Sequence, residues 1–187
     1  GLGVTSVGSQ TINVSGNVYQ VAQPTFASTT VNLGNVRVGG TAQQAVGITN
    51  TNVAPAGFQE GLSASLGGAT GGISANGNFT NLAAGGTNNS ALLVGLNTAT
   101  AGARTGSATV NLVSTGVDTS GLADLGLGTQ TINVSGNVYQ VAAGQLNTAS
   151  FNFGTVQVGQ SVSQLLSISN IAAGAAGYVE DLNARFG

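Results

Sequence analysis

The sequence of 187 residues contains no cysteine, methionine, tryptophan, histidine or lysine. Without histidine and cysteine, the usual ligand sets for zinc, copper and haem cannot be assembled. The same absence excludes a Ser-His-Asp triad and a Cys-His pair. Without lysine the chain can form no Schiff base and lacks the phosphate-binding lysine of nucleotide loops. We therefore expect no enzyme, with no catalytic site, no cofactor and no bound metal ion.

Charged side chains are also scarce, at 4% of the residues against roughly 25% in an average soluble domain. The basic residues are Arg37, Arg104 and Arg185, too few for the basic surface that nucleic-acid binding requires. No apolar run reaches the roughly 18 residues that would indicate a membrane span. A neutral polar surface opposes close packing of identical copies less than a charged one does. The composition therefore favours an assembled material. The lack of cysteine fits an exported, extracellular or cell-surface protein, and equally many cytosolic ones.

Hydrophobic residues make up 41% of the chain and follow the period of β-strands. Ile132, Val134 and Val138 alternate with polar residues, which predicts a strand with one buried face. Clusters of glycine, asparagine, serine and threonine separate such runs, as turns require. No stretch has the pattern of a capped helix. The fold class is therefore predicted to be all-β, with strands near residues 29–33, 36–38, 42–50, 58–66, 72–80, 89–97, 106–114 and 129–139.

A long internal repeat organises the sequence. Gln10–Ala22 recurs without change as Gln130–Ala142, an offset of 120 residues. At the same offset Val31–Gly39 aligns with Phe151–Gly159, and Leu62–Gly67 aligns with Leu182–Gly187. Repetition at a fixed period indicates an array of similar modules, and 120 residues is a normal size for a β-sandwich.

The repeat divides the chain into three parts. Residues 22–140 are predicted to form one complete β-sandwich module. Residues 1–21 are expected to be the last strand of a preceding module, and residues 141–187 the first half of a following one. An incomplete sheet presents unpaired backbone groups, so a strand such as Gln10–Tyr19 could complete the sheet of a neighbouring molecule.

Four blocks of sequence resemble choice-of-anchor D domains: Val31–Gly39, Ile48–Asn52, Thr98–Ala108 and Val134–Tyr139. The resemblance spans nearly the whole chain, including the repeated part. It implies immunoglobulin-like β-sandwich modules in tandem, of a kind found in large exported or surface-attached bacterial proteins. It implies no catalytic activity and no functional residues.

The few acidic residues offer weak candidate sites. Asp118 and Asp124 flank a loop and could contribute to a calcium site, but two carboxylates fall short of its six to eight oxygens. A solvated loop is therefore the expectation. Glu60 recurs as Glu180 and is expected to be solvated or paired with an arginine such as Arg104, which would contribute about 0–1 kcal/mol.

Other polar patterns have simple structural explanations. The glycine-rich stretch Gly67–Gly72 lacks the lysine and the strand-to-helix context of a phosphate-binding loop, so it predicts a flexible turn. Sites of the Asn-X-Ser/Thr type are expected by chance in so polar a sequence. Tyr19, Tyr139 and Tyr178 could line a sugar site, but each is predicted to lie on a strand, where packing is the ordinary role.

These observations predict a structural protein: the subunit of an extracellular bacterial filament or surface stalk, with identical subunits as its partners. The alternative is an adhesin that binds a surface glycan or matrix component through its loops. The sequence itself contains no aromatic-rich loop that would select the alternative.

Overall fold

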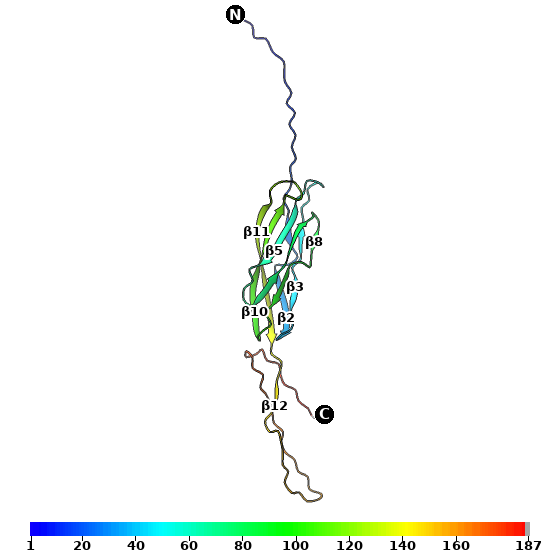
Figure 1. The fold of residues 1–187 in the computed structure, drawn as a ribbon, viewed down its shortest axis with the longest axis vertical. Coiled ribbons are helices and arrows are strands. Elements are labelled where there is room, and N and C mark those ends of the chain that lie inside the picture. Colours follow the sequence, from blue (N-terminus) through cyan, green and yellow to red (C-terminus); the bar gives the residue numbers. More distant parts are fainter. Residues whose placement is uncertain (186–187) are drawn as a thin grey trace.

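The computed structural model describes residues 1–185, and all regular secondary structure in that range is β-strand. The molecule is elongated along one axis (Figure 1). We call residues 22–139 the central body, residues 1–19 the N-terminal arm and residues 141–185 the C-terminal segment. The arm and the C-terminal segment extend from opposite ends of the central body. The all-β prediction is confirmed.

Eleven strands build the central body. They are β1 (Pro24–Phe26), β2 (Thr30–Arg37), β3 (Gln43–Ala45), β4 (Ile48–Asn50), β5 (Gly61–Gly67), β6 (Ile73–Asn76), β7 (Asn78–Leu82), β8 (Thr87–Asn88), β9 (Leu93–Leu96), β10 (Gly102–Thr115) and β11 (Leu125–Tyr139). They form a five-stranded sheet in the order β2-β11-β10-β5-β7 and two three-stranded sheets in the orders β1-β4-β8 and β3-β9-β6. The antiparallel pair β10 and β11 is the longest element, whereas β2 runs parallel to β11.

The core lies between the five-stranded sheet and the two smaller sheets. Val110 and Ile132 from the five-stranded sheet are fully buried, and Ile48 and Val94 from the smaller sheets join them in one apolar cluster. From Ile132 to Tyr139 in β11, buried residues alternate with exposed or partly buried ones, as the sequence predicted. This alternation arises because successive side chains of a strand point to opposite faces.

Two predicted strands are each divided in two. The predicted strand 42–50 is divided into β3 and β4, which belong to different sheets, with the backbone carbonyl of Gly47 accepting a hydrogen bond from Ala27 N. The predicted strand 72–80 is divided into β6 and β7 at Gly77, where φ is +110°. A Cβ at Gly77 would overlap the carbonyl oxygen of Ala91, so only glycine allows the chain to turn there.

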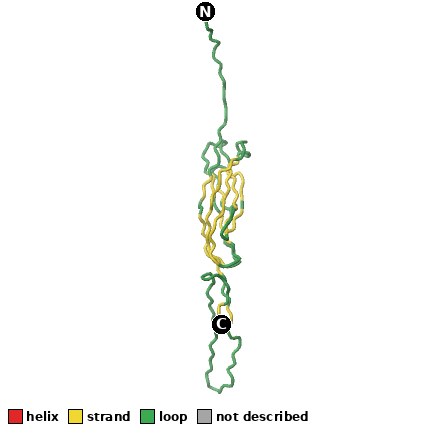
Figure 2. Tube along the Cα trace, turned by 90° about the vertical axis from the view of Figure 1, so that its left-hand side faces the viewer, coloured by secondary structure: helices red, strands yellow, loops and turns green. Residues whose placement is uncertain are grey.

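Outside the central body little strand is present (Figure 2). In the C-terminal segment β12 (Gly144–Leu146) pairs with β13 (Ile168–Asn170). The N-terminal arm, predicted to be a strand, is extended but belongs to no sheet. The identical sequence at residues 130–139 belongs to β11, which is paired with β2. The arm therefore cannot take that position beside β2 of its own chain. The predicted alignment of Phe186 and Gly187 lies outside the described residues.

Candidate assembly interface

The end of β11 is joined to the C-terminal segment by the backbone of Gln140. Its N–H donates to the carbonyl of Tyr178 at 2.8 Å, and its carbonyl accepts from the N–H of Glu180 at 2.9 Å. Together these bonds form a parallel bridge between Gln140 and Val179. The direction of β11 is thereby continued into the next part of the chain.

The same arrangement occurs where the N-terminal arm meets the central body. The N–H of Gln20 donates to the carbonyl of Phe58 at 3.0 Å, and the carbonyl of Gln20 accepts from Glu60 N at 3.0 Å. Gln20 bridges Gln59 in parallel. Every partner here lies 120 positions before its counterpart at Gln140, so the sequence repeat is also a repeat of backbone geometry.

An aromatic pair supports each junction. Tyr19 contacts Phe58 and Tyr139 contacts Tyr178, both with ring centroids 5.5 Å apart and with ring planes tilted by 47° and 48°. Tilted contacts at such distances contribute about 0.5–1.5 kcal/mol beyond the area they bury. The three tyrosines therefore lie in packing contacts at the two junctions.

A hydrogen-bonded asparagine that the sequence analysis did not single out completes each junction; it is buried at the first junction and exposed at the second. Asn50 has no exposed surface; its Nδ2 donates to the carbonyl of Glu60 at 3.1 Å, and its Oδ1 accepts from Gln23 N at 3.0 Å. Asn170 makes the counterparts of both bonds, each at 3.0 Å. An asparagine that follows an apolar strand at the same place in both repeats was the available signal, because a buried amide must be hydrogen-bonded.

One ion pair links the central body to the C-terminal segment. The Nε of Arg37, at the end of β2, donates to Oε1 of Glu180 at 2.7 Å. The hydrogen bond from Arg37 to Glu180, followed by the charge of that carboxylate, raises the pKa of Arg37 above its ordinary value. The counterpart of Arg37 in the repeat is Gln157, an uncharged residue that cannot form the same ion pair.

Glu60, the counterpart of Glu180, occupies a different environment. It is buried, with Ser114 Oγ donating to its Oε2 at 2.7 Å and Ser120 Oγ donating to its Oε1 at 2.6 Å. Ser114 Oγ also accepts from the N–H of Ala22 at 2.7 Å. This network ties the first residue of the central body to β10 and to the loop that follows it.

Both expectations for Glu60, a solvated side chain or a pair with Arg104, are wrong. Arg104 lies near the start of β10, whereas Glu60 contacts Ser114 near its end. Ten strand residues separate the two positions, which is about 33 Å at roughly 3.3 Å per residue. The guanidinium of Arg104 instead donates to the carbonyl of Asn97 at 3.0 Å and to Thr100 Oγ1 at 2.8 Å.

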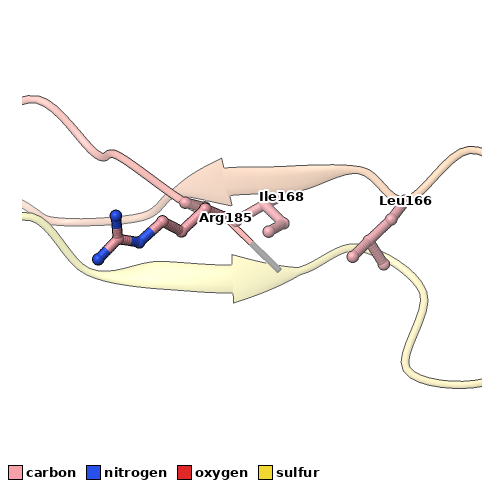
Figure 3. Close-up of a pocket in the computed structure, with 4 residues that line it drawn as sticks. Leu166, Ile168 and Arg185 are labelled. Atoms are coloured by element: carbon pink, nitrogen blue, oxygen red, sulfur yellow. The ribbon is translucent and has the colours of Figure 1, made fainter. Parts of the chain in front are cut away.

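The C-terminal segment contains a cavity of about 200 Å³ beside β13 (Figure 3). It is lined by Leu166, Ile168, Ala184 and Arg185. The counterparts of the first three in the central body are Val46, Ile48 and Ala64, which are 2%, 1% and 4% exposed. These three lining residues are therefore the counterparts of core residues of the central body.

No protein-family model matches the chain, and no curated protein matches it. Among solved structures, the ASH / PapD-like domain of human CEP192 (PapD-like domain 7) is similar to it. The sequence identity is 9% and the TM-score is 0.44, over 73% of this chain and 97% of that chain. A likeness at this level supports no conclusion about function.

The remaining candidates from the sequence lie in turns. Asp124 Oδ1 accepts from the backbone N–H of Gly116 at 2.9 Å and of Val117 at 3.2 Å, so this carboxylate closes the loop that Asp118 and Asp124 flank. Within residues 1–185 no three His, Cys, Asp or Glu side chains are grouped closely enough to hold a metal ion.

The glycine-rich stretch before β6 is a turn, as predicted, but it is closely packed. A Cβ at Gly71, where φ is +63°, would overlap the carbonyl oxygen of Thr105. Thr70 N donates to the carbonyl of Ser107 at 2.9 Å, which holds this turn against β10.

In the part of the chain that the structure describes, no helix is long and apolar enough to cross a membrane.

Proposed function

We propose that this chain is a structural subunit of an extracellular bacterial filament or surface stalk, built from tandem immunoglobulin-like β-sandwich modules. In this proposal the central body is one complete module. The observation that carries it is the junction that occurs twice, 120 residues apart, with the same backbone bridge, aromatic pair and hydrogen-bonded asparagine.

A repeated junction of this kind supports a mechanical role because it limits bending between neighbouring units. Three kinds of contact act within a few residues of Gln140: two backbone hydrogen bonds, a pair of tyrosine rings and the ion pair of Arg37. A linker without such contacts would behave as a flexible coil. The elongated shape in Figure 1 is what successive units joined in this way would produce.

Composition and resemblance support the same role. A surface with 4% charged residues is suited to close contact between identical copies. The resemblance to choice-of-anchor D domains points to an exported, surface-attached bacterial protein. The lack of histidine, cysteine and lysine leaves catalysis to residue types that seldom carry it alone, so we assign the chain no enzymatic activity.

Electron microscopy of the purified chain tests this role. We expect regular filaments or rods whose axial repeat matches the length of one or two modules. Tyr178→Ala should increase the bending between units, whereas Tyr178→Phe should not, because Phe58 occupies the counterpart position. Globular particles without a preferred long axis would contradict the proposal.

A second candidate, a glycan-binding adhesin, is favoured by one groove. It lies on the outer face of the five-stranded sheet, has a volume of about 440 Å³, and is lined by Thr30, Asn32, Thr105, Asn133 and Ser135 among others. Hydroxyl and amide groups are suited to the hydroxyls of sugars, although no aromatic side chain lines the groove. Glycan-array binding that Asn133→Ala abolishes would support this function over the structural one.

A further inference from the structure

We propose that the N-terminal arm of one copy adds to the C-terminal segment of a second copy as a parallel strand beside residues 150–157. The proposal rests on the structural function proposed above and names the partner and the register of the contact. The observations that carry it concern the arm, the edge that receives it and the pairing of β11 with β2.

The arm carries the sequence of a strand whose place in the fold is known. Residues 10–19 are identical to residues 130–139 of β11. The backbone preceding them also matches, since φ is +86° at Gly8 and +91° at Gly128. In the arm the side chains of Ile12, Val14 and Val18 are 85%, 90% and 88% exposed. Their counterparts in β11 are 0%, 2% and 0% exposed, so burial of this face is what the same sequence achieves in the central body.

The receiving edge already has the shape of β2. The N–H of Gly154 donates to Asn152 Oδ1 at 2.8 Å, and Gly34 N donates to Asn32 Oδ1 at 2.9 Å. The values of φ at Gly154 and Gly34 are +65° and +67°. The same bend is therefore present in residues 150–157 before any strand is added, which lowers the ordering cost of binding.

Apolar side chains along that edge are uncovered. Phe151, Phe153 and Val156 are 37%, 50% and 46% exposed, whereas Val31, the counterpart of Phe151, is 5% exposed. Contiguous exposed apolar surface of this kind marks an interaction site. The strand that covers the counterpart surface in the central body is β11.

The register follows from the parallel ladder between β11 and β2. Val134 is opposite Val31 and Val138 is opposite Val36. The arm is the counterpart of β11 one repeat earlier, and residues 150–157 are the counterpart of β2 one repeat later. The same register therefore places Val14 of one copy opposite Phe151 of the other. The same shift places Asn13 opposite Ser150, because Asn133 is opposite Thr30. These two contacts lie on opposite faces of the added strand, Val14 on the core face and Asn13 on the outer face.

The geometry makes the contact intermolecular. The arm and the C-terminal segment lie at opposite ends of the central body (Figure 1), so the arm cannot reach the segment of its own chain. After Tyr19 the donor chain enters its own junction at Gln20. Each added copy thus continues in the direction of the previous one, head to tail.

Cysteine cross-linking of the full chain tests the register. The sequence has no cysteine, so an introduced pair is the sole route to a disulfide. We expect Asn13→Cys and Ser150→Cys variants, when mixed and oxidised, to give a disulfide-linked dimer, since adjacent strands about 4.8 Å apart fall within reach of a disulfide. Asn13→Cys mixed with Gln160→Cys, a position outside the proposed contact, should give a yield of disulfide-linked dimer that is at least about ten-fold lower.

Two matched variants, Val14→Asp and Asn13→Asp, place a negative charge on opposite faces of the arm. Both positions lie outside the central body, so neither substitution disturbs its folding. Val14→Asp should abolish the concentration-dependent increase in mass seen by light scattering, because the carboxylate would enter an apolar core. Asn13→Asp should retain the increase, because its side chain would face solvent.

Each outcome is decisive. A wild-type chain that stays monomeric at high concentration, or equal assembly of Val14→Asp and Asn13→Asp, would overturn the strand addition. If the chain forms filaments but the Asn13→Cys and Ser150→Cys variants give no disulfide-linked dimer, the strand addition is overturned and the structural function is left intact. Conversely, cross-linked copies that form only globular aggregates would contradict the filament or stalk and retain the strand contact.

Discussion

Removing the hydroxyl of Ser114 should destabilise the central body strongly. Ser114 is fully buried; its Oγ accepts from Ala22 N at 2.7 Å and donates to Glu60 Oε2 at 2.7 Å. In Ser114→Ala both groups lose a partner in a place that water does not reach, and each such loss costs about 1–3 kcal/mol. We expect the free energy of unfolding to fall by roughly 2–6 kcal/mol from these two losses, a large part of the total stability of a domain, which is about 5–15 kcal/mol.

Urea unfolding followed by circular dichroism measures this change, because a shift of the midpoint at constant slope reports stability alone. Ser65→Ala is the matched control: Ser65 is exposed on β5, and its substitution should change stability by less than about 0.5 kcal/mol. A loss below about 1 kcal/mol for Ser114→Ala, with an unchanged slope, would refute the reasoning that the Ala22–Ser114–Glu60 network is closed to water.

Three further predictions concern the junction and the turns. Arg37→Gln, which installs the residue of the next repeat, should leave the unfolding of the central body unchanged and broaden the distribution of distances between spin labels placed on either side of Gln140. Tyr178→Ala should lower by about 0.5–1.5 kcal/mol the free energy of undocking the C-terminal segment, measured by hydrogen exchange at Gln140, whereas Tyr178→Phe should leave it unchanged. Gly77→Ala should lower the free energy of unfolding by about 4 kcal/mol or more, because of backbone strain and overlap with the carbonyl of Ala91. Gly85→Ala, where no atom lies near the added Cβ, should lower it by about 1–2 kcal/mol. Similar urea midpoints for these two variants would contradict the argument.

The sequence was sufficient for the fold class and for the faces of the strands, because alternation of apolar and polar residues directly encodes which side is buried. It was not sufficient for pairing. The identical sequences at residues 10–19 and 130–139 adopt an unpaired arm and a fully paired strand, so the neighbours, and not the local sequence, decide the outcome. The same limit explains the error at Glu60, whose partners Ser114 and Ser120 are 54 and 60 residues away and carry no charge that would mark them.

The parallel pairing of β2 with β11 has a consequence for the central body under tension. Tension along the chain enters the body from the N-terminal arm and leaves it into the C-terminal segment, which extend from its opposite ends in Figure 1. The first strand after the arm is β1, which is paired with β4. The next strand, β2, and the last strand of the body, β11, are neighbours that run in the same direction over six paired positions, with further bonds from Asn133 N to Thr29 O and from Val38 N to Tyr139 O. A stretching force therefore slides one strand along the other and strains all of these bonds together, instead of opening them one after another from an end. The β2–β11 ladder therefore yields only when all of its bonds rupture together.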